Sequence, residues 1–191
     1  MKMRSLYSVI PALLIASLFT GCAWQSQVGP ESPYYLPPIG SQLVVNKSIP
    51  IRANKASAWL QDGAVRVHKD IDFYYPNCKF ELNTVVSINR TVKPGSFSII
   101  HVYQEEQFML WPTIRLAASF RFGVGMGGVM AGGDGGSSPI PYATVFNLRS
   151  DTQPDVLRMT CMHWEDPTDA RFLTLAEIRQ AIGGYISVII E

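Results

Sequence analysis

The most constraining feature of this sequence is a series of short segments that are rich in β-branched and aromatic residues and are separated by turn residues. Such segments favour β-strands, because branched and aromatic side chains pack well on a pleated surface. The segments are QLVV, IPIRA, ASAWLQDG, CKFELNTVVSINR, SFSIIHVYQ, YATVFNL (142–148), VLRMTCMHW (156–164) and the terminal YISVII. The sequence therefore predicts a mainly-β fold, either a β-sandwich or a partly open barrel.

Alternation within these segments predicts which side chains share a face. In the cysteine segment, Cys78, Phe80 and Leu82 are expected on one side of the strand. The pair Asp62-Gly63 ends its segment with residues typical of a hairpin turn. In SFSIIHVYQ the residues expected to share one face are Phe97, Ile99, His101 and Tyr103.

One helix is predicted near the end of the chain, in LTLAEIRQAIGG. Thr174 stands at the N-cap position, with Glu177 three residues later, which is the spacing of a capping box. Gly183 stands where a left-handed C-terminal cap is expected. The apolar stripe consists of Leu175, Ile178 and Ile182. We therefore expect one C-terminal α-helix that packs on the β-domain.

The N-terminus has the pattern of an export signal. Lys2 and Arg4 precede an apolar run from Leu6 to Phe19, and small residues follow it. A membrane-spanning helix needs about 20 apolar residues, so the length favours a cleaved signal over a retained anchor. Residues 1–21 are therefore expected to be a signal peptide.

Residues 19–22, FTGC, resemble the lipobox, the processing signal of bacterial lipoproteins. Gly21 and Cys22 match it, Thr20 is tolerated, and Phe19 departs from the usual leucine, although Leu18 lies beside it. The resemblance implies that Cys22 becomes the N-terminus and carries covalent lipid. We expect no other cofactor. Two or more acyl chains hold a protein firmly to a membrane. By analogy with enterobacterial lipoproteins, alanine after this cysteine implies the periplasmic face of the outer membrane.

Composition divides the rest of the chain. Residues 22–41 hold four prolines and two glycines, which predicts an extended tether behind the lipidated cysteine. Residues 42–191 are long enough for a single domain with its own core. Within this domain, 122–139 form a glycine-rich insertion that lacks the lysine of a phosphate-binding loop.

The remaining cysteines, Cys78 and Cys161, are expected to form a disulfide, because a cysteine pair in an oxidising compartment usually does. An alternative is open for the second of them. On a strand, Met159, Cys161 and His163 would share a face, and thiolate, imidazole and thioether together suit copper. The spacing lacks the four-ligand pattern of a strong metal motif, so the disulfide is favoured and no metal site is assigned.

The glycine-rich arm has two interpretations. Glycines without side chains build little core, which favours a mobile hairpin tip or a disordered insertion. Alternatively, the arm carries apolar side chains outward to a partner, because exposed apolar residues in quantity mark interaction sites. The candidate interaction residues are Trp111, Val124, Met126, Val129 and Met130.

Charge and motifs restrict the function. Without Lys2 and Arg4 the chain has 14 basic and 15 acidic residues, a net charge of about −1 with no basic stripe, so nucleic acid is a poor candidate partner. His68 beside Asp70 and His163 near Glu165 are ordinary sequence neighbours, and no catalytic motif is present. We therefore expect a non-enzyme, although a hydrolase with scattered site residues remains open.

The segments YYPNCKFEL and LTLAEIRQAIG resemble parts of a proteobacterial lipoprotein family of uncharacterised function, and this resemblance implies no activity or site. The leading hypothesis is a membrane-anchored periplasmic lipoprotein that acts as a structural or protein-interaction module of the cell envelope. Its partner would be an envelope protein or a second copy of the chain. The alternative is a lipoprotein that binds a small ligand or copper.

Overall fold

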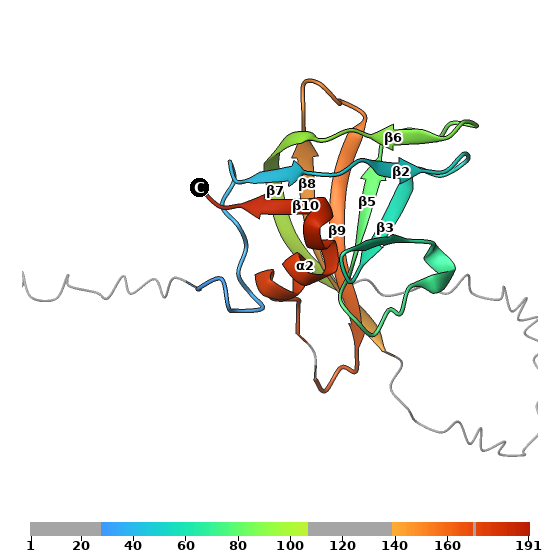
Figure 1. Ribbon diagram of the computed structural model, residues 1–191. Helices are drawn as coiled ribbons and strands as arrows, with labels where there is room; N and C mark the ends of the chain where they lie inside the picture. The colour runs from blue at the N-terminus through green and yellow to red at the C-terminus, as the bar shows by residue number, and fades with distance from the viewer. Residues whose placement is uncertain (1–27, 107–138, 170) are drawn as a thin grey trace, which may run out of the picture.

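The computed structural model describes residues 28–106, 139–169 and 171–191. These residues form a mainly-β domain, in which eight strands make one antiparallel sheet that curls into half a barrel (Figure 1). The predicted fold class is thereby confirmed, and of the two expected architectures the chain adopts the partly open barrel. The strands are β1 (Gln42–Val45), β2 (Ile49–Ile51), β3 (Ser57–Gln61), β4 (Ala64–Arg66), β5 (Asn77–Leu82), β6 (Arg90–Val92), β7 (Gly95–Glu106), β8 (Ile140–Arg149), β9 (Val156–Glu165) and β10 (Ile186–Ile189).

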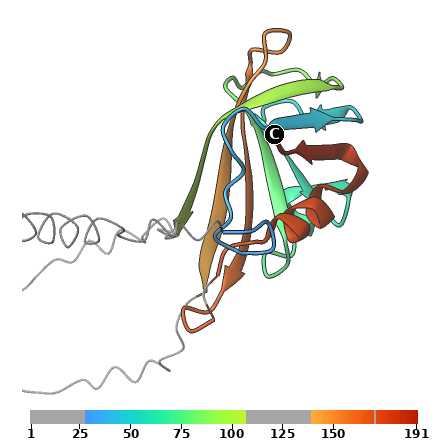
Figure 2. The same cartoon turned by 90° about the vertical axis from the view of Figure 1, so that its left-hand side faces the viewer.

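The strand order leaves the barrel open on one side. The sheet runs β10-β1-β7-β8-β9-β5-β3-β4, so β10 and β4 are its two edges. β2 and β6 form a separate two-stranded ladder. Along the chain, β2 follows β1 and β6 precedes β7. Seen from the side, the long strands form one wall, and β2, β10 and the helix α2 (Leu175–Ile182) lie on its concave side (Figure 2). The core lies between them.

The predicted alternation holds in β5 and fails in β7. Cys78, Phe80 and Leu82 all face the core, as expected. In β7, however, Ile99 pairs with Leu148 while His101 pairs with the next residue of β8, which makes Ile100 an extra residue in the ladder. This β-bulge exchanges the two faces. Phe97 and Ile99 are therefore fully buried, whereas His101 is exposed, and the prediction that Phe97, Ile99, His101 and Tyr103 share a face was wrong.

The predicted helix is present as α2 and covers part of the open side. The Thr174 hydroxyl accepts from the Glu177 N–H, and the Glu177 carboxylate accepts from the Thr174 N–H at 2.8 Å, which completes the capping box. The helix packs against β3, β5 and β10. Its buried residues are Leu175, Ile178, Ala181 and Ile182, which include the whole predicted stripe.

Two glycines fix how the β3–β4 hairpin meets the end of α2. Asp62 and Gly63 both have positive φ, 52° and 69°, as in a two-residue type I′ turn. The Gly63 N–H donates to the Ala181 carbonyl at 3.1 Å. Gly183 has φ 51° and ψ −139°, so it has a positive φ but is not in the left-handed helical region that was predicted. A Cβ atom on Gly183 would lie 2.3 Å from the Gly63 Cα, so this contact requires glycine.

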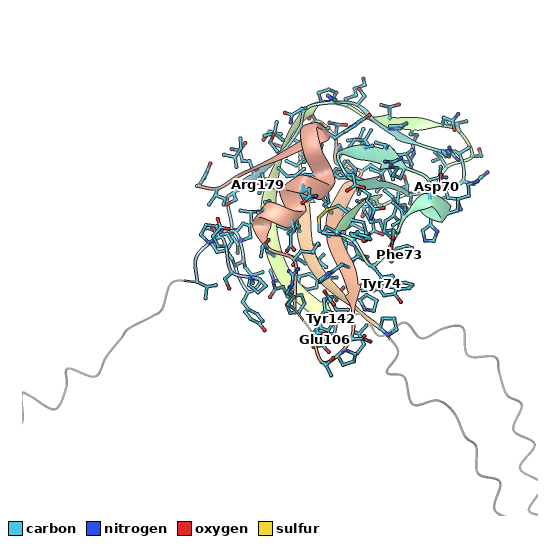
Figure 3. The ribbon with its side chains drawn as sticks, turned by 60° about the horizontal axis from the view of Figure 1, so that its bottom comes forward. Asp70, Phe73, Tyr74, Glu106, Tyr142 and Arg179 are labelled. Carbon is cyan, nitrogen blue, oxygen red and sulfur yellow. A yellow bond between two sulfur atoms is a disulfide. The ribbon has the colours of Figure 1, made fainter. Side chains whose placement is uncertain are left out.

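The predicted disulfide is confirmed. Cys78 of β5 and Cys161 of β9 are direct cross-strand partners, and their sulfur atoms are bonded at 2.11 Å. Both residues are completely buried, and the bond is visible beside α2 in Figure 3. The bridge therefore joins two neighbouring strands close to α2, which packs against one of them, β5.

Part of the predicted tether contacts the domain. The Gln104 side chain donates to the Pro33 carbonyl at 2.6 Å, Tyr34 meets Phe172 edge to face, and Tyr35 packs against the core. By these contacts, residues 33–35 of the predicted tether belong with the domain. Within the described residues, no helix combines the length and the apolar character needed to cross a bilayer.

Candidate functional site

A cleft of about 680 Å³ lies on the open side of the half-barrel, beside the sheet edge formed by β3 and β4. β2 and β3, which lie side by side at the right of Figure 1, contribute two of its walls. Tyr185, directly before β10, contributes a third. The volume is in the range of small-molecule sites, which is about 300–1,000 Å³. This is the candidate functional site, and we call it the basic cleft.

The register of the edge strands brings the cleft residues together. Arg66 of β4 lies opposite Trp59 of β3, and Trp59 lies opposite Lys79 of β5. Because opposite residues of antiparallel strands point to the same face, these three side chains form one row across the sheet. The Lys79 ammonium lies 5.8 Å from the centroid of the Trp59 ring, within cation–π range. The row therefore places a cation on each side of one indole.

The opposite wall is a loop whose position is fixed by backbone hydrogen bonds. Arg52 and Lys55 lie in the connection between β2 and β3 and line the cleft. Within this connection, the Ala53 N–H donates to the Asn89 side chain at 2.9 Å, and the Asn54 N–H donates to the Val86 carbonyl at 2.8 Å. These contacts hold the loop backbone in place, so the two cations start from fixed backbone positions beside the cleft.

The basic residues of the cleft differ in their pairing. Arg52, Lys55 and Arg66 are exposed, and within the part of the chain that the structure describes none of them forms an ion pair. Lys79, in contrast, contacts Glu81 at 2.6 Å. The cleft lining itself contains no Asp or Glu among the described residues. The charge facing the cleft is therefore positive.

Glu81 neutralises the cations on the sheet side. Its carboxylate accepts from Arg158 at 2.7 Å as well as from Lys79. Burial alone would raise the pKa of Glu81, but the hydrogen bonds from Lys79 and Arg158 outweigh it and lower the pKa. The hydrogen bond to Glu81 is in turn the main reason why the pKa of Arg158 is raised. Two strong cations thus share one carboxylate, whereas Arg66 and the loop cations have no such partner in the described parts of the chain.

An aromatic cluster continues from the cleft along the outer face. The Trp59 ring contacts His68 and Phe73 at centroid distances of 5.2 Å and 5.4 Å. Phe73 stacks on Trp164 at 5.0 Å, and the exposed Tyr74 meets Trp164 edge to face. Figure 3 shows Phe73 and Tyr74 on the same side of the domain as Asp70, away from Arg179 of α2. These rings make the surface beside the cleft apolar.

The alternative copper residues share a face, as predicted, but they do not meet as free ligands. Met159 is fully buried in the core, and the Cys161 sulfur is bonded to Cys78, so it has no thiolate to offer while the bridge is intact. The His163 Nε2 lies 2.9 Å from the Arg171 carbonyl and its Nδ1 lies 3.7 Å from Glu165. Among residues 28–106, 139–169 and 171–191, no group of three His, Cys, Asp or Glu side chains is placed to hold a metal ion.

Several predicted sites lie outside the described residues. These are the lipidation site Cys22 and the interaction residues Trp111, Val124, Met126, Val129 and Met130, together with 122–138 of the glycine-rich insertion. Of the sequence neighbours considered for catalysis, His68 and Asp70 bound a short 3-10 turn, and the His68 ring contacts Trp59 rather than a carboxylate.

Sequence reasoning missed the basic cleft because its cations come from separate segments. Arg52 and Lys55 precede β3, Arg66 ends β4, and Lys79 lies in β5. No two of the cleft's cations are adjacent in sequence, so no basic run marks the site. The only local signal is Arg52 and Lys55 in RANK, three residues apart.

Comparison with family models, with curated proteins and with solved structures finds no match for the chain. The resemblance of its segments to an uncharacterised lipoprotein family therefore stays a prediction.

Proposed function

We propose that this chain is a lipoprotein of the cell envelope, anchored through lipid on Cys22 at the periplasmic face of the outer membrane, and that its β-domain is an interaction module. The observation that carries the proposal is the buried Cys78–Cys161 bridge. Disulfides persist in oxidising compartments and are rare in the cytosol, so a bridge in the centre of the core is consistent with export. The lipobox-like FTGC supports the anchor.

The basic cleft supports the interaction role. Exposed arginines at a surface are among the residues that dominate binding energies, and aromatic neighbours add to them. Arg52 and Arg66 line the cleft beside Trp59, without ion pairs in the described part of the chain. The glycine-rich arm, with Trp111 to Met130, remains a second predicted contact surface.

Metabolic labelling with radioactive palmitate tests the anchor. We expect label in the wild-type protein, in the membrane fraction, and none in Cys22→Ala. Absence of label from the wild type, with the precursor in a soluble cytosolic fraction, would contradict the proposal. A Cys78→Ala/Cys161→Ala double variant is the matched control, because it removes the other two cysteines and leaves the lipid site, with label counted per amount of protein since this variant is expected to be less stable.

Photo-crosslinking in intact cells tests the interaction module. A crosslinking amino acid at position 66 is expected to capture a partner, whereas one at position 149, an exposed arginine on β8, is expected to capture none. The mass of the adduct separates a second copy of the chain from another envelope protein. Deletion of 122–139 tests the arm: an unchanged set of partners would remove the arm as a contact surface.

A second candidate function is the binding of a small ligand, and the volume of the basic cleft favours it. The copper form of this alternative needs the bridge to be reduced. Mass spectrometry and metal analysis of protein purified from the periplasm decide this point: an intact bridge without copper would remove the copper form.

A further inference from the structure

The backbone walls of the basic cleft are preformed. The Tyr185 carbonyl accepts from the Asn46 and Lys47 N–H groups at 2.8 Å and 3.4 Å, which fixes the wall next to β10. The loop with Arg52 and Lys55 is held by the hydrogen bonds from Ala53 and Asn54 described above. The remaining wall is the sheet itself. Because the backbone of the walls is already fixed, binding has to order only the side chains of the cleft, which favours recognition of a small molecule.

The charge of the cleft selects an anion. Four basic residues line it, and the described lining offers no carboxylate. Arg52 and Arg66 are the important pair, because the guanidinium group presents parallel N–H donors that match the two oxygens of a phosphate or a carboxylate. Lys55 and Lys79 add point charges, the second of them shared with Glu81. The site is thus suited to an oxyanion with at least two free oxygens.

Most of the remaining lining is apolar, and it includes aromatic rings. Trp59 and Tyr185 line the cleft together with Pro50, Ala58 and Val65. An inorganic anion would leave these surfaces exposed to water. A ligand that fills the cleft must therefore also have an apolar ring face, while the Ser57 hydroxyl and the open rim suit a ligand with hydroxyl groups.

A sugar with an acidic substituent has all of these properties. We infer that the basic cleft binds a monosaccharide unit that carries a phosphate or a carboxylate, with the anion between Arg52 and Arg66 and the ring against Trp59. This inference rests on the second candidate function, small-ligand binding, and names the ligand's chemistry.

Calorimetric titration of the full mature chain in detergent tests it, with glucose 6-phosphate and glucuronate as probes. At least one of them is expected to bind at least about tenfold more tightly than glucose or inorganic phosphate. Added salt should weaken binding, because the attraction is electrostatic. Equal affinity for inorganic phosphate, equal affinity for glucose, or no binding of either acidic sugar up to about 10 mM would each overturn the inference.

Variants locate the site. Arg66→Gln and Arg52→Gln should each weaken binding about tenfold or more, because each removes a charged bidentate donor. Arg149→Gln, an exposed arginine outside the cleft, is the matched control and should bind like the wild type. Melting curves verify that each variant is folded. Unchanged affinity in both cleft variants would overturn the inference. Palmitate incorporation at Cys22 does not depend on the cleft, so failure here is distinguishable from failure of the proposed lipoprotein.

Discussion

The open side of the half-barrel has two regions that differ in how they are filled. Between the edge strands β10 and β4, one part is covered by α2: the helix buries an apolar stripe, and the Gly63 N–H bonds to the end of the helix. The adjoining part is the basic cleft, lined by cations and aromatic rings and left open to solvent. The open side of the same sheet thus contains both the helix that closes the core and the candidate site.

Both regions use the same strand, which makes the difference informative. In β3, Leu60 is fully buried in the core, whereas Trp59 faces outward into the cleft. Ala58 marks the boundary, since it is 6 % exposed and belongs both to the core and to the cleft lining. The helix α2 covers the part of the sheet that presents apolar side chains. The part that presents the cations of the cleft remains open to solvent. If this division holds, stability depends on the closed region and binding depends on the open one.

The largest expected effect comes from the bridge close to α2. Replacing both cysteines, in Cys78→Ala/Cys161→Ala, should lower the free energy of unfolding by about 4 kcal/mol, because the bridge closes a long loop in the unfolded chain. Urea unfolding with and without reductant measures it. Reductant should have the same effect on the wild type and none on the double variant. If reductant leaves the wild-type midpoint unchanged, the bridge does not contribute to the closed region.

The next effect is at the glycine contact. Gly183→Ala should cost about 3 kcal/mol or more, because the new Cβ would lie 2.3 Å from the Gly63 Cα and the positive φ disfavours side chains. Gly184→Ala is the matched control, since its Cβ would meet only the flexible end of Lys47 at 3.6 Å. Thermal and urea unfolding compare the two. Equal stability of the two variants would show that the hairpin does not depend on this close contact.

These two positions show what sequence can and cannot predict. The bridge was predicted because, apart from Cys22, an exported chain with two cysteines can pair them in only one way. The capping box of α2 was predicted because its signal lies within four residues. The contact of Gly63 with Gly183 joins residues that are far apart in the chain, and no local pattern encodes it. The bulge at Ile100 was missed for a related reason, because an extra residue is defined only by its partner strand.

The basic cleft was unpredictable in the same way. Its row of Arg66, Trp59 and Lys79 exists because three strands align in one register, and each strand contributes a single residue. The even balance of charges in the chain gave no indication of a positive site. Local capping and turn signals are readable from sequence, whereas a site assembled across strands requires the register.

A smaller effect is expected at the start of α2. The Arg171 hydrogen bonds and the Thr174 donors lower the pKa of Glu177 from 4.5 to about 2, against the opposing effect of burial. Because the pKa of Glu177 is lower in the folded than in the unfolded state, its carboxylate stabilises the protein at pH values above the unfolded-state pKa. This contribution is lost as the pH falls towards the folded-state pKa. Glu177→Gln should therefore cost about 1–2 kcal/mol at neutral pH, after allowing for the partial exposure of Arg171.

The pH dependence separates this effect from a general loss of packing. The difference in unfolding free energy between the wild type and Glu177→Gln should shrink as the pH falls from 4.5 towards about 2. Glu31→Gln, at an exposed position, is the control and should differ little from the wild type at any pH. A difference that stays constant down to pH 2 would mean that the ionised carboxylate is not what stabilises the helix start.

The smallest effect is expected in the open region. Arg66→Gln and Arg52→Gln should each change the free energy of unfolding by less than about 0.5 kcal/mol, because neither guanidinium is buried or ion-paired within the described residues. The double variant should be as stable as the wild type or slightly more stable, since it removes two like charges that face one cleft. Urea unfolding measures both. A loss above about 1 kcal/mol would make the arginines part of the scaffold and end the division between a stabilising region and a binding region. Unchanged stability together with weakened binding of the acidic sugar would instead establish that these cations serve the ligand alone.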